Sequence, residues 1–162
     1  MSLALPEPTL EPVLDADVEL GELVDHGTTR SGHRRVIPIV GGRLRGLGRF
    51  AATLPSAAIE SGGADWQIVR ADGAIEVDTR YTARAADGSL IYLQTSGVRT
   101  GSPDVLAALG RGEQVDPAAY YFRILVRFET SADALRELEH GLFVASAGRE
   151  SGRVRYRRYR VG

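Results

Sequence analysis

The sequence contains no cysteine, no lysine and no asparagine. Without cysteine the chain can form no disulfide, no thiolate nucleophile, no iron–sulfur cluster and no cysteine-ligated zinc site. Without lysine it cannot form a Schiff base, which excludes a covalently held pyridoxal cofactor. These absences remove several kinds of enzyme chemistry before any motif is considered.

A large excess of charge of either sign is also missing. The 20 basic residues, all of them arginine, face 21 acidic residues, which gives a net charge of −1 at pH 7. This balance argues against capture of nucleic acid or anionic membrane by bulk electrostatics. No apolar run approaches the roughly 18 residues of a membrane span, and the acidic start does not resemble a secretory signal. We therefore expect a cytoplasmic protein that binds neither nucleic acid nor membrane.

The length of 162 residues fits one globular domain, and the composition is ordinary for one, with 43% hydrophobic and 25% charged residues. The start of the chain differs, because Pro6, Pro8 and Pro12 lie there among acidic residues. We expect residues 1–14 to form an acidic, proline-rich arm and residues 15–162 to form a single domain.

Short extended segments separated by turn signals dominate the chain. Asp72-Gly73 and Asp87-Gly88 are strong hairpin signals, and they separate the extended segments 65–70, 74–84 and 89–99. These three segments predict an antiparallel meander. With a long strand at 120–130 and two short helices, 104–109 and 131–139, the chain is expected to be all-β, with about eight to nine strands that close into an antiparallel barrel.

Asp65 and Arg80 are the first candidates for chemistry. If the turn at Asp72-Gly73 has two residues, Asp65 lies opposite Arg80 across the hairpin. If the turn has three residues, the pairing shifts by one, and Trp66 joins the face that carries Asp78 and Arg80. A carboxylate held by arginine can act as a general base, whereas the plainer interpretation is an exposed cross-strand ion pair.

Tyr121 and Arg123 form the second candidate pair, because they point to the same side of the strand at 120–130. Arginine could hold a carboxylate or enolate oxygen there, and tyrosine could exchange a proton. Tyr81 and Tyr92, on the strands of the meander, are alternatives for the proton. The plainer interpretation is that these side chains only cover the sheet.

The three histidines, His26, His33 and His140, are scattered over loops or the ends of predicted elements. No spacing resembles the three convergent ligands of a mononuclear metal site, and no glycine-rich segment follows the pattern of a nucleotide site. We therefore predict that the protein uses no metal and no cofactor.

Several motifs together resemble a known family. They are Gly62-Gly63-Ala64-Asp65-Trp66, Asp78-x-Arg80-Tyr81-Thr82, Asp87-Gly88-x-Leu90-Ile91-Tyr92 and Tyr120-Tyr121-Phe122-Arg123. They resemble the domain of unknown function 3237, also called uncharacterised protein family 0311, over roughly residues 15–161. The resemblance implies a calycin-like antiparallel β-barrel, often self-associated as a homodimer or higher homo-oligomer, without an agreed activity.

The sequence is compatible with three functions. The favoured one is a cofactor-independent isomerase, lyase or cyclase that moves a proton on a small oxygenated substrate in a biosynthetic or catabolic reaction. Asp65, Arg80 and Tyr121 would be catalytic; Trp66, Asp78, Tyr81, Tyr92 and Arg123 would bind the substrate. The alternatives are a non-catalytic barrel that binds the same kind of ligand and, less favoured, an interaction module.

Overall fold

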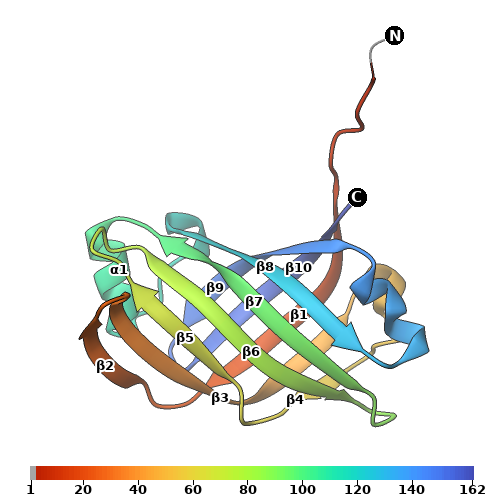
Figure 1. The fold of residues 1–162 in the computed structure, drawn as a ribbon, viewed down its shortest axis with the longest axis horizontal. Helices are drawn as coiled ribbons and strands as arrows, with labels where there is room; N and C mark the ends of the chain where they lie inside the picture. The colour runs from red at the N-terminus through yellow and green to blue at the C-terminus, as the bar shows by residue number, and fades with distance from the viewer. Residues whose placement is uncertain (1–2) are drawn as a thin grey trace.

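Ten β-strands form one antiparallel sheet that closes on itself in the computed structural model, which describes residues 3–162 (Figure 1). Around the barrel the order is β1, β10, β9, β8, β7, β6, β4 and β3, and β3 pairs with β1 again. The short strands β4 and β5 share the position between β3 and β6, and β2 pairs only with β3. The strands are β1 (Leu10–Leu20), β2 (Val24–Thr29), β3 (Gly32–Gly46), β4 (Ala57–Ile59), β5 (Ala64–Val69), β6 (Ile75–Ala85), β7 (Leu90–Thr100), β8 (Tyr121–Thr130), β9 (Leu142–Glu150) and β10 (Arg153–Val161).

The barrel closes where β1 pairs with β10 on one side and with β3 on the other. Ala16 lies opposite Tyr156 on β10 and opposite Leu44 on β3. The β3 backbone approaches β1 so closely that a Cβ at Gly42 would lie 2.1 Å from the carbonyl oxygen of Asp17. Gly42 also has a φ of 127°, so glycine is required there on both counts. Every strand position around the barrel therefore has a paired neighbour on each side, whereas β2 is paired along one edge only.

The predicted meander is confirmed, because β6 pairs antiparallel with both β5 and β7. Gly73 and Gly88, in the two predicted turns, have φ values of 85° and 88°, as their turns require. The prediction of an antiparallel barrel is therefore correct. The barrel itself has eight strand positions, within the expected eight to nine, and β2 and the division of one position into β4 and β5 bring the total to ten.

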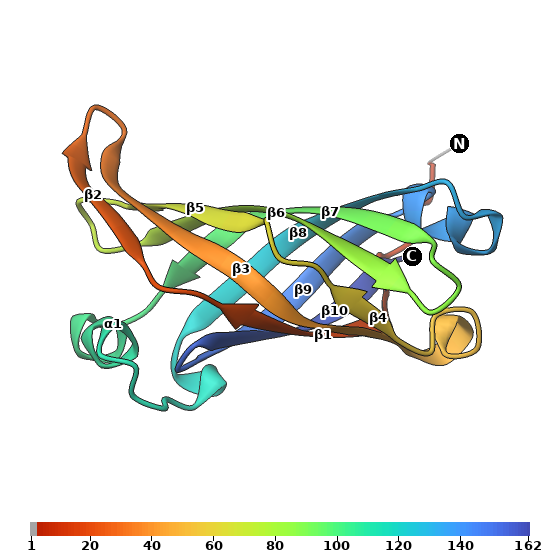
Figure 2. The same cartoon turned by 90° about the horizontal axis from the view of Figure 1, so that it is seen from below.

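The first predicted helix is present as α1 (Pro103–Gly110), and the Ser102 hydroxyl accepts a hydrogen bond from the amide of Val105 at its start. The second is not an α-helix but the 3₁₀ segment η3 (Asp133–Glu139). Two shorter 3₁₀ segments are η1 (Gly48–Phe50) and η2 (Pro117–Ala119). Figure 2 shows α1 at one end of the barrel, with η1 and η3 at the other. None of the helices in residues 3–162 is long and apolar enough to cross a membrane.

The expected arm of residues 1–14 is too long, because its last residues belong to the barrel. β1 begins at Leu10, and both Val13 and Leu14 are fully buried in the core. The prolines suggested an arm, but Pro12 lies on β1 beside a register shift in its pairing with β10, a position that tolerates a missing amide. At this end of the chain residues 3–8 extend away from the barrel, as Figure 1 shows.

Alternation along β8 shows how the sequence separates the inside of the barrel from the outside. Phe122, Ile124, Val126 and Phe128 are buried, whereas the residues between them are exposed. The ring of Phe128 meets that of Phe143 on β9 edge to face, with 5.1 Å between centroids. Period-two burial of this kind fills the part of the interior beside β8 with packed apolar side chains.

We predict that two leucine-to-alanine substitutions on adjacent strands will differ sharply in stability. Leu93 on β7 is fully buried, whereas Leu125 on β8 points outward and is 59% exposed. Leu93→Ala should lower the free energy of unfolding by about 2–5 kcal/mol, because it leaves a cavity. Leu125→Ala should change it by less than about 0.5 kcal/mol. Urea denaturation measures both, and equal losses would contradict the assignment of faces.

Candidate functional site

Charged and amide side chains occupy inward positions near the α1 end of the barrel. Asp65 and Gln67 alternate inward along β5, where only 9% and 4% of their surfaces are exposed. Arg35 on β3 lies opposite Gln67, and Thr79 on β6 lies opposite Asp65. Together with two arginines from β7 and β9 they form what we call the inner polar cluster: Arg35, Asp65, Gln67, Thr79, Arg99 and Arg149.

Asp65 is the one carboxylate of this cluster, and protein donors hold both of its oxygens. Oδ2 accepts a hydrogen bond from Nε2 of Gln67 at 2.6 Å, and Oδ1 accepts one from the amide of Asp78 at 3.1 Å. Gln67 in turn accepts a hydrogen bond from Arg35 at its Oε1, at 3.2 Å. The carboxylate is therefore fixed in position without any arginine in direct contact.

Burial raises the pKa of the Asp65 carboxyl above its ordinary value. Hydrogen bonds from Gln67, the Asp78 amide and Thr79 oppose this shift, as does the positive charge of Arg99, but the loss of hydration outweighs them. A carboxyl group with a raised pKa holds and releases a proton closer to neutral pH than an exposed one does. That property suits a general base or acid.

Arg99 is the most isolated charge of the cluster. It is 5% exposed, its Nε has no hydrogen-bond partner, and its guanidinium lies over the ring of Phe122 at 5.4 Å. Burial, together with the like charges of Arg149 and Arg35, lowers the pKa of Arg99 to about 10. The group is still charged at neutral pH, so an unpaired cation lies inside the barrel.

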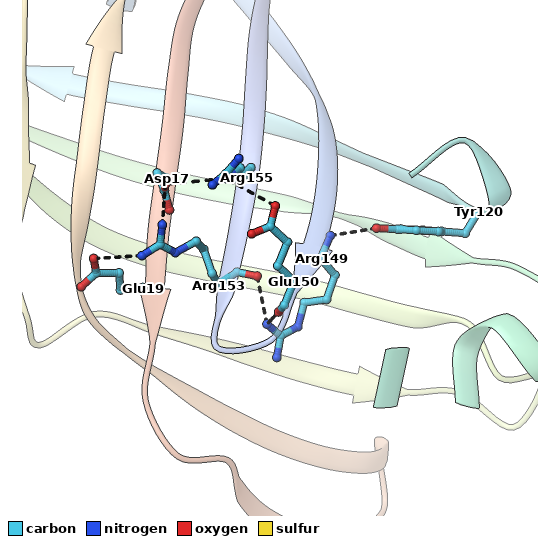
Figure 3. Close-up of polar contacts among 7 residues, drawn as sticks. All are labelled: Asp17, Glu19, Tyr120, Arg149, Glu150, Arg153 and Arg155. Atoms are coloured by element: carbon cyan, nitrogen blue, oxygen red, sulfur yellow. Dashed lines mark hydrogen bonds and ion pairs between the residues drawn. The ribbon is translucent and has the colours of Figure 1, made fainter. Parts of the chain in front are cut away.

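Arg149 lies where β9 leads into the hairpin to β10, as Figure 3 shows. Its guanidinium donates hydrogen bonds to the carbonyl oxygens of Glu150 and Arg153. Its backbone amide donates to the hydroxyl of Tyr120 at 2.8 Å. Tyr120 thereby occupies the place of a strand partner beside β9, beyond the end of the β8–β9 pairing.

Arg158 on β10 is a second deeply buried arginine and is fully inaccessible to solvent. It donates a hydrogen bond to the hydroxyl of Tyr81, and its guanidinium lies 5.6 Å from the ring centre of Tyr156 and 5.9 Å from that of Phe128. Burial raises the pKa of both Tyr81 and Tyr156. Both phenols therefore keep their protons at neutral pH.

A groove of about 860 Å³ lies on the outside of the barrel, between the sheet β3–β1–β10–β9 and the loop that precedes η2. Its arginines are matched by carboxylates. Arg157 donates to Asp15 at 2.8 Å, and Arg153, just beyond the groove lining, pairs with Asp17 at 3.0 Å. Figure 3 shows part of this network, in which Arg155 joins Asp17 to Glu150. The charges that line the groove are largely paired with one another, and Arg149 and Tyr156 border it as well as the interior.

The structure contains the second of the two predicted registers. The turn has three residues, because the Arg70 amide donates to the Ala74 carbonyl, and Ala64 rather than Asp65 lies opposite Arg80. Asp65 therefore points inward and Arg80 outward, so these two do not form the predicted pair. Arg80 instead lies beside Asp78 at 3.4 Å and over Trp66 at 5.8 Å on the outer face.

The other predicted site residues are divided between the two faces. Tyr121 is 51% exposed on the outside, with Arg123 at 5.3 Å from its ring centre. Tyr92 also points outward and lines a shallow hollow beside Thr130. Tyr81 alone joins Asp65 inside the barrel. Asp65, Arg80, Tyr121 and Arg123 therefore do not form one site as expected, because the odd positions of β8 and the even positions of β6 face outward.

Residues not singled out from the sequence complete the interior: Arg35, Gln67, Thr79, Arg99, Tyr120, Arg149, Tyr156 and Arg158. Alternation could have found some of them. Arg99 has the same parity as Ile91 and Leu93 on its strand, and Arg158 has the same parity as Val154. An arginine in phase with buried aliphatic residues is the signal that was available. Within residues 3–162, no three histidine, aspartate or glutamate side chains are placed to hold a metal ion.

The fold and the inner polar cluster define a small closed β-barrel with a charged interior. A family model described as a protein of unknown function (DUF3237) matches residues 8–161. A UPF0311 protein of Bradyrhizobium diazoefficiens is 39% identical over 149 residues, which cover 91% of this chain and 93% of that protein. The chain belongs to this uncharacterised family, as its motifs indicated.

Solved structures agree with this assignment. A conserved protein of unknown function from Rhodopseudomonas palustris is 34% identical, with a TM-score of 0.88 over 98% of this chain and 100% of that one. A β-barrel-like protein from Acinetobacter baumannii is 40% identical, with a TM-score of 0.83 over 99% and 100%. A more distant structure, described as an enzyme from Penicillium herquei, has a TM-score of 0.69 over the whole of both chains at 16% identity, and so shares the fold.

We predict that Asp65→Asn will change how stability depends on pH. Because the pKa of Asp65 is raised by folding, the native protein binds this proton more tightly than the unfolded chain does. Its contribution to stability is full at acidic pH and is lost as pH rises above about 4. The free energy of unfolding of Asp65→Asn minus that of the wild type should therefore increase from pH 4 to pH 8.

Urea denaturation at several pH values gives this difference directly. Altered hydrogen bonds to Gln67 and Asp78 add an offset that does not change with pH, so only the slope carries the prediction. A difference that is flat or falls with pH would show that the pKa of Asp65 is not raised in the folded protein.

Proposed function

We propose that the protein is a cofactor-independent enzyme that transfers a proton on a small oxygenated substrate inside the barrel, with Asp65 as the base. The observation that carries this proposal is that Asp65 is a single buried carboxylate with a raised pKa, fixed among cationic side chains. Isomerisation, elimination and ring closure all need such a group at the reacting carbon or hydroxyl.

The surroundings of Asp65 suit the charge changes of such a reaction. Removing a proton from a carbon beside a carbonyl group leaves negative charge on the oxygen. The positive charge of Arg99 acts on Asp65, and Arg35 and Arg149 act on Arg99 in turn, so these cations share one electrostatic environment. Fixed cations in a water-poor site stabilise a developing oxyanion more than water would.

Tyr156 is the proton donor in this proposal. Tyr156 lies within the electrostatic influence of Asp65, Arg99 and Tyr81, and its raised pKa keeps the phenol protonated. Tyr81, a predicted donor, is engaged with Arg158, so Tyr156 takes the donor role in this proposal. Tyr156 would donate its own proton at a second position of the substrate, and the proton taken up by Asp65 would then restore the phenol through solvent.

The distant structure from Penicillium herquei, described as an enzyme, supports the proposal in one respect only. It indicates that this fold can hold catalytic residues. One observation favours the second candidate, a barrel that binds its ligand without reaction: both oxygens of Asp65 already accept hydrogen bonds from the protein. A carboxylate has about four acceptor positions, however, so the three donors Gln67, the Asp78 amide and Thr79 leave one of them for a ligand.

Proton exchange between substrate and solvent tests this proposal without requiring that the natural substrate be known. The protein is incubated in D₂O with a panel of small ketones, hydroxyketones and enones, and deuterium uptake is followed by mass spectrometry. We expect catalysed uptake for at least one compound, and Asp65→Asn should lower its rate by about 10²–10⁴-fold while the affinity changes by less than about tenfold. Glu76→Gln, at an exposed outer position of β6, is the matched control.

The outcomes separate the two candidate functions. Uptake that survives Asp65→Asn unchanged would remove Asp65 as the base. Binding of panel compounds without any uptake, in the wild type and in both variants, would favour the non-catalytic barrel.

A further inference from the structure

Ten of the 20 arginines form ion pairs with carboxylates within residues 3–162, and all ten lie at the surface. Every arginine that forms an ion pair within residues 3–162 has a side chain at least 37% exposed. The arginines that point into the barrel form none. These inward positions are Arg35, Arg99, Arg149 and Arg158, of which Arg99 and Arg158 are buried and Arg35 and Arg149 are half-buried.

The unpaired arginines also retain unused donors. Nε of Arg35, Nε of Arg99, and Nε and Nη1 of Arg158 are buried without a hydrogen-bond partner. Arginine cannot lose its charge at neutral pH, so the interior keeps both the charge and the empty donors. An unpaired buried charge is among the costliest features a folded protein can hold, and it is rarely present without a use.

Asp65 does not balance these charges. None of the ion pairs in residues 3–162 involves it, because its oxygens are held by Gln67 and by the Asp78 amide. Three guanidinium groups of the inner polar cluster therefore face one carboxylate that burial already disfavours as an anion. This excess of positive charge is larger than a developing oxyanion alone requires.

We infer that the interior binds a ligand that enters as an anion, a small carboxylate, with its carboxylate on Arg99 and with Arg35 and Arg149 beside it. This inference rests on the proposed function for the location of the site and adds the class of substrate to it. The planar guanidinium matches a carboxylate with two parallel hydrogen bonds. The Phe122 ring beneath Arg99 and the nearby Tyr156 provide apolar surface for the rest of the molecule.

The outer groove is a weaker place for such a ligand. Arg157 is held by Asp15 through two hydrogen bonds of 2.8 and 3.0 Å, and Arg153 and Arg155 share Asp17. A carboxylate bound there would have to compete with carboxylates already in place and with bulk water. Arg157 is therefore a suitable control for the interior site.

The test compares each carboxylate with its own amide, so that size and shape are matched and only the charge differs. Benzoate with benzamide, and acetate with acetamide, are titrated at pH 7 and low chloride into the full-length protein, with calorimetry and thermal unfolding as readouts. We expect at least one carboxylate to bind and raise Tm, and its amide to bind at least about tenfold more weakly.

Arg99→Met should weaken the carboxylate by at least about tenfold, and Arg157→Met should leave its affinity within about twofold. Arg99→Met should also raise the Tm of the unliganded protein, because a hydrophobic side chain of similar size replaces an unpaired buried charge. If Arg99 had only a structural role, the same change would lower Tm. Arg99→Lys keeps the charge but loses the planar fork, and gives a second test should the methionine variant fail to fold.

The inference is wrong if neither carboxylate is preferred over its amide, or if Arg157→Met and not Arg99→Met removes the preference. Its failure is distinct from failure of the proposed function. A carboxylate preference that depends on Arg99 stands even if Asp65→Asn retains proton exchange. Proton exchange that depends on Asp65 stands even if neutral substrates bind as well as anions.

Discussion

Pairing of β1 with both β10 and β3 is the interaction on which the rest of the structure depends. It uses both edges of the first strand, turns a long sheet into a closed barrel and so gives every strand an inside and an outside. Once the barrel is closed, the parity of a residue along its strand decides whether it meets water or the core. The charged interior follows from this closure, because Arg99 and Arg158 occupy positions of inward parity.

Much of the fold could be predicted from local signals. Asp72-Gly73 and Asp87-Gly88 fixed the meander, and Ser102 fixed the start of α1, because turns and caps depend on a few adjacent residues. The start of β1 could not be predicted in this way. Its prolines and acidic residues resemble an arm, and only pairing with β10, some 140 positions later in the chain, makes Leu10 part of the barrel.

The site was harder to predict because it depends on single-residue registers. One extra residue in the turn before Ala74 moved Arg80 to the outside while Asp65 stayed inside, and both registers were compatible with the sequence. For Tyr121, the predicted strand and the division of its residues between two faces were correct. The face that turns inward is the other one, which carries the buried Phe122 and Phe128. The inward arginines were missed since arginine is almost always exposed.

Because buried arginine is rare, the inward arginines indicate a role for the interior. A barrel of this size would be more stable with leucine or methionine in place of Arg99 and Arg158, because aliphatic side chains need neither hydration nor a partner. The lost hydration of Arg158 is partly offset by the ring faces of Tyr156 and Phe128 and by the hydroxyl of Tyr81. Arg99 has a single ring and no hydrogen bond. The residue with the least compensation from the protein is the one whose charge acts on the buried carboxylate, and this is why we propose that a ligand supplies the missing compensation.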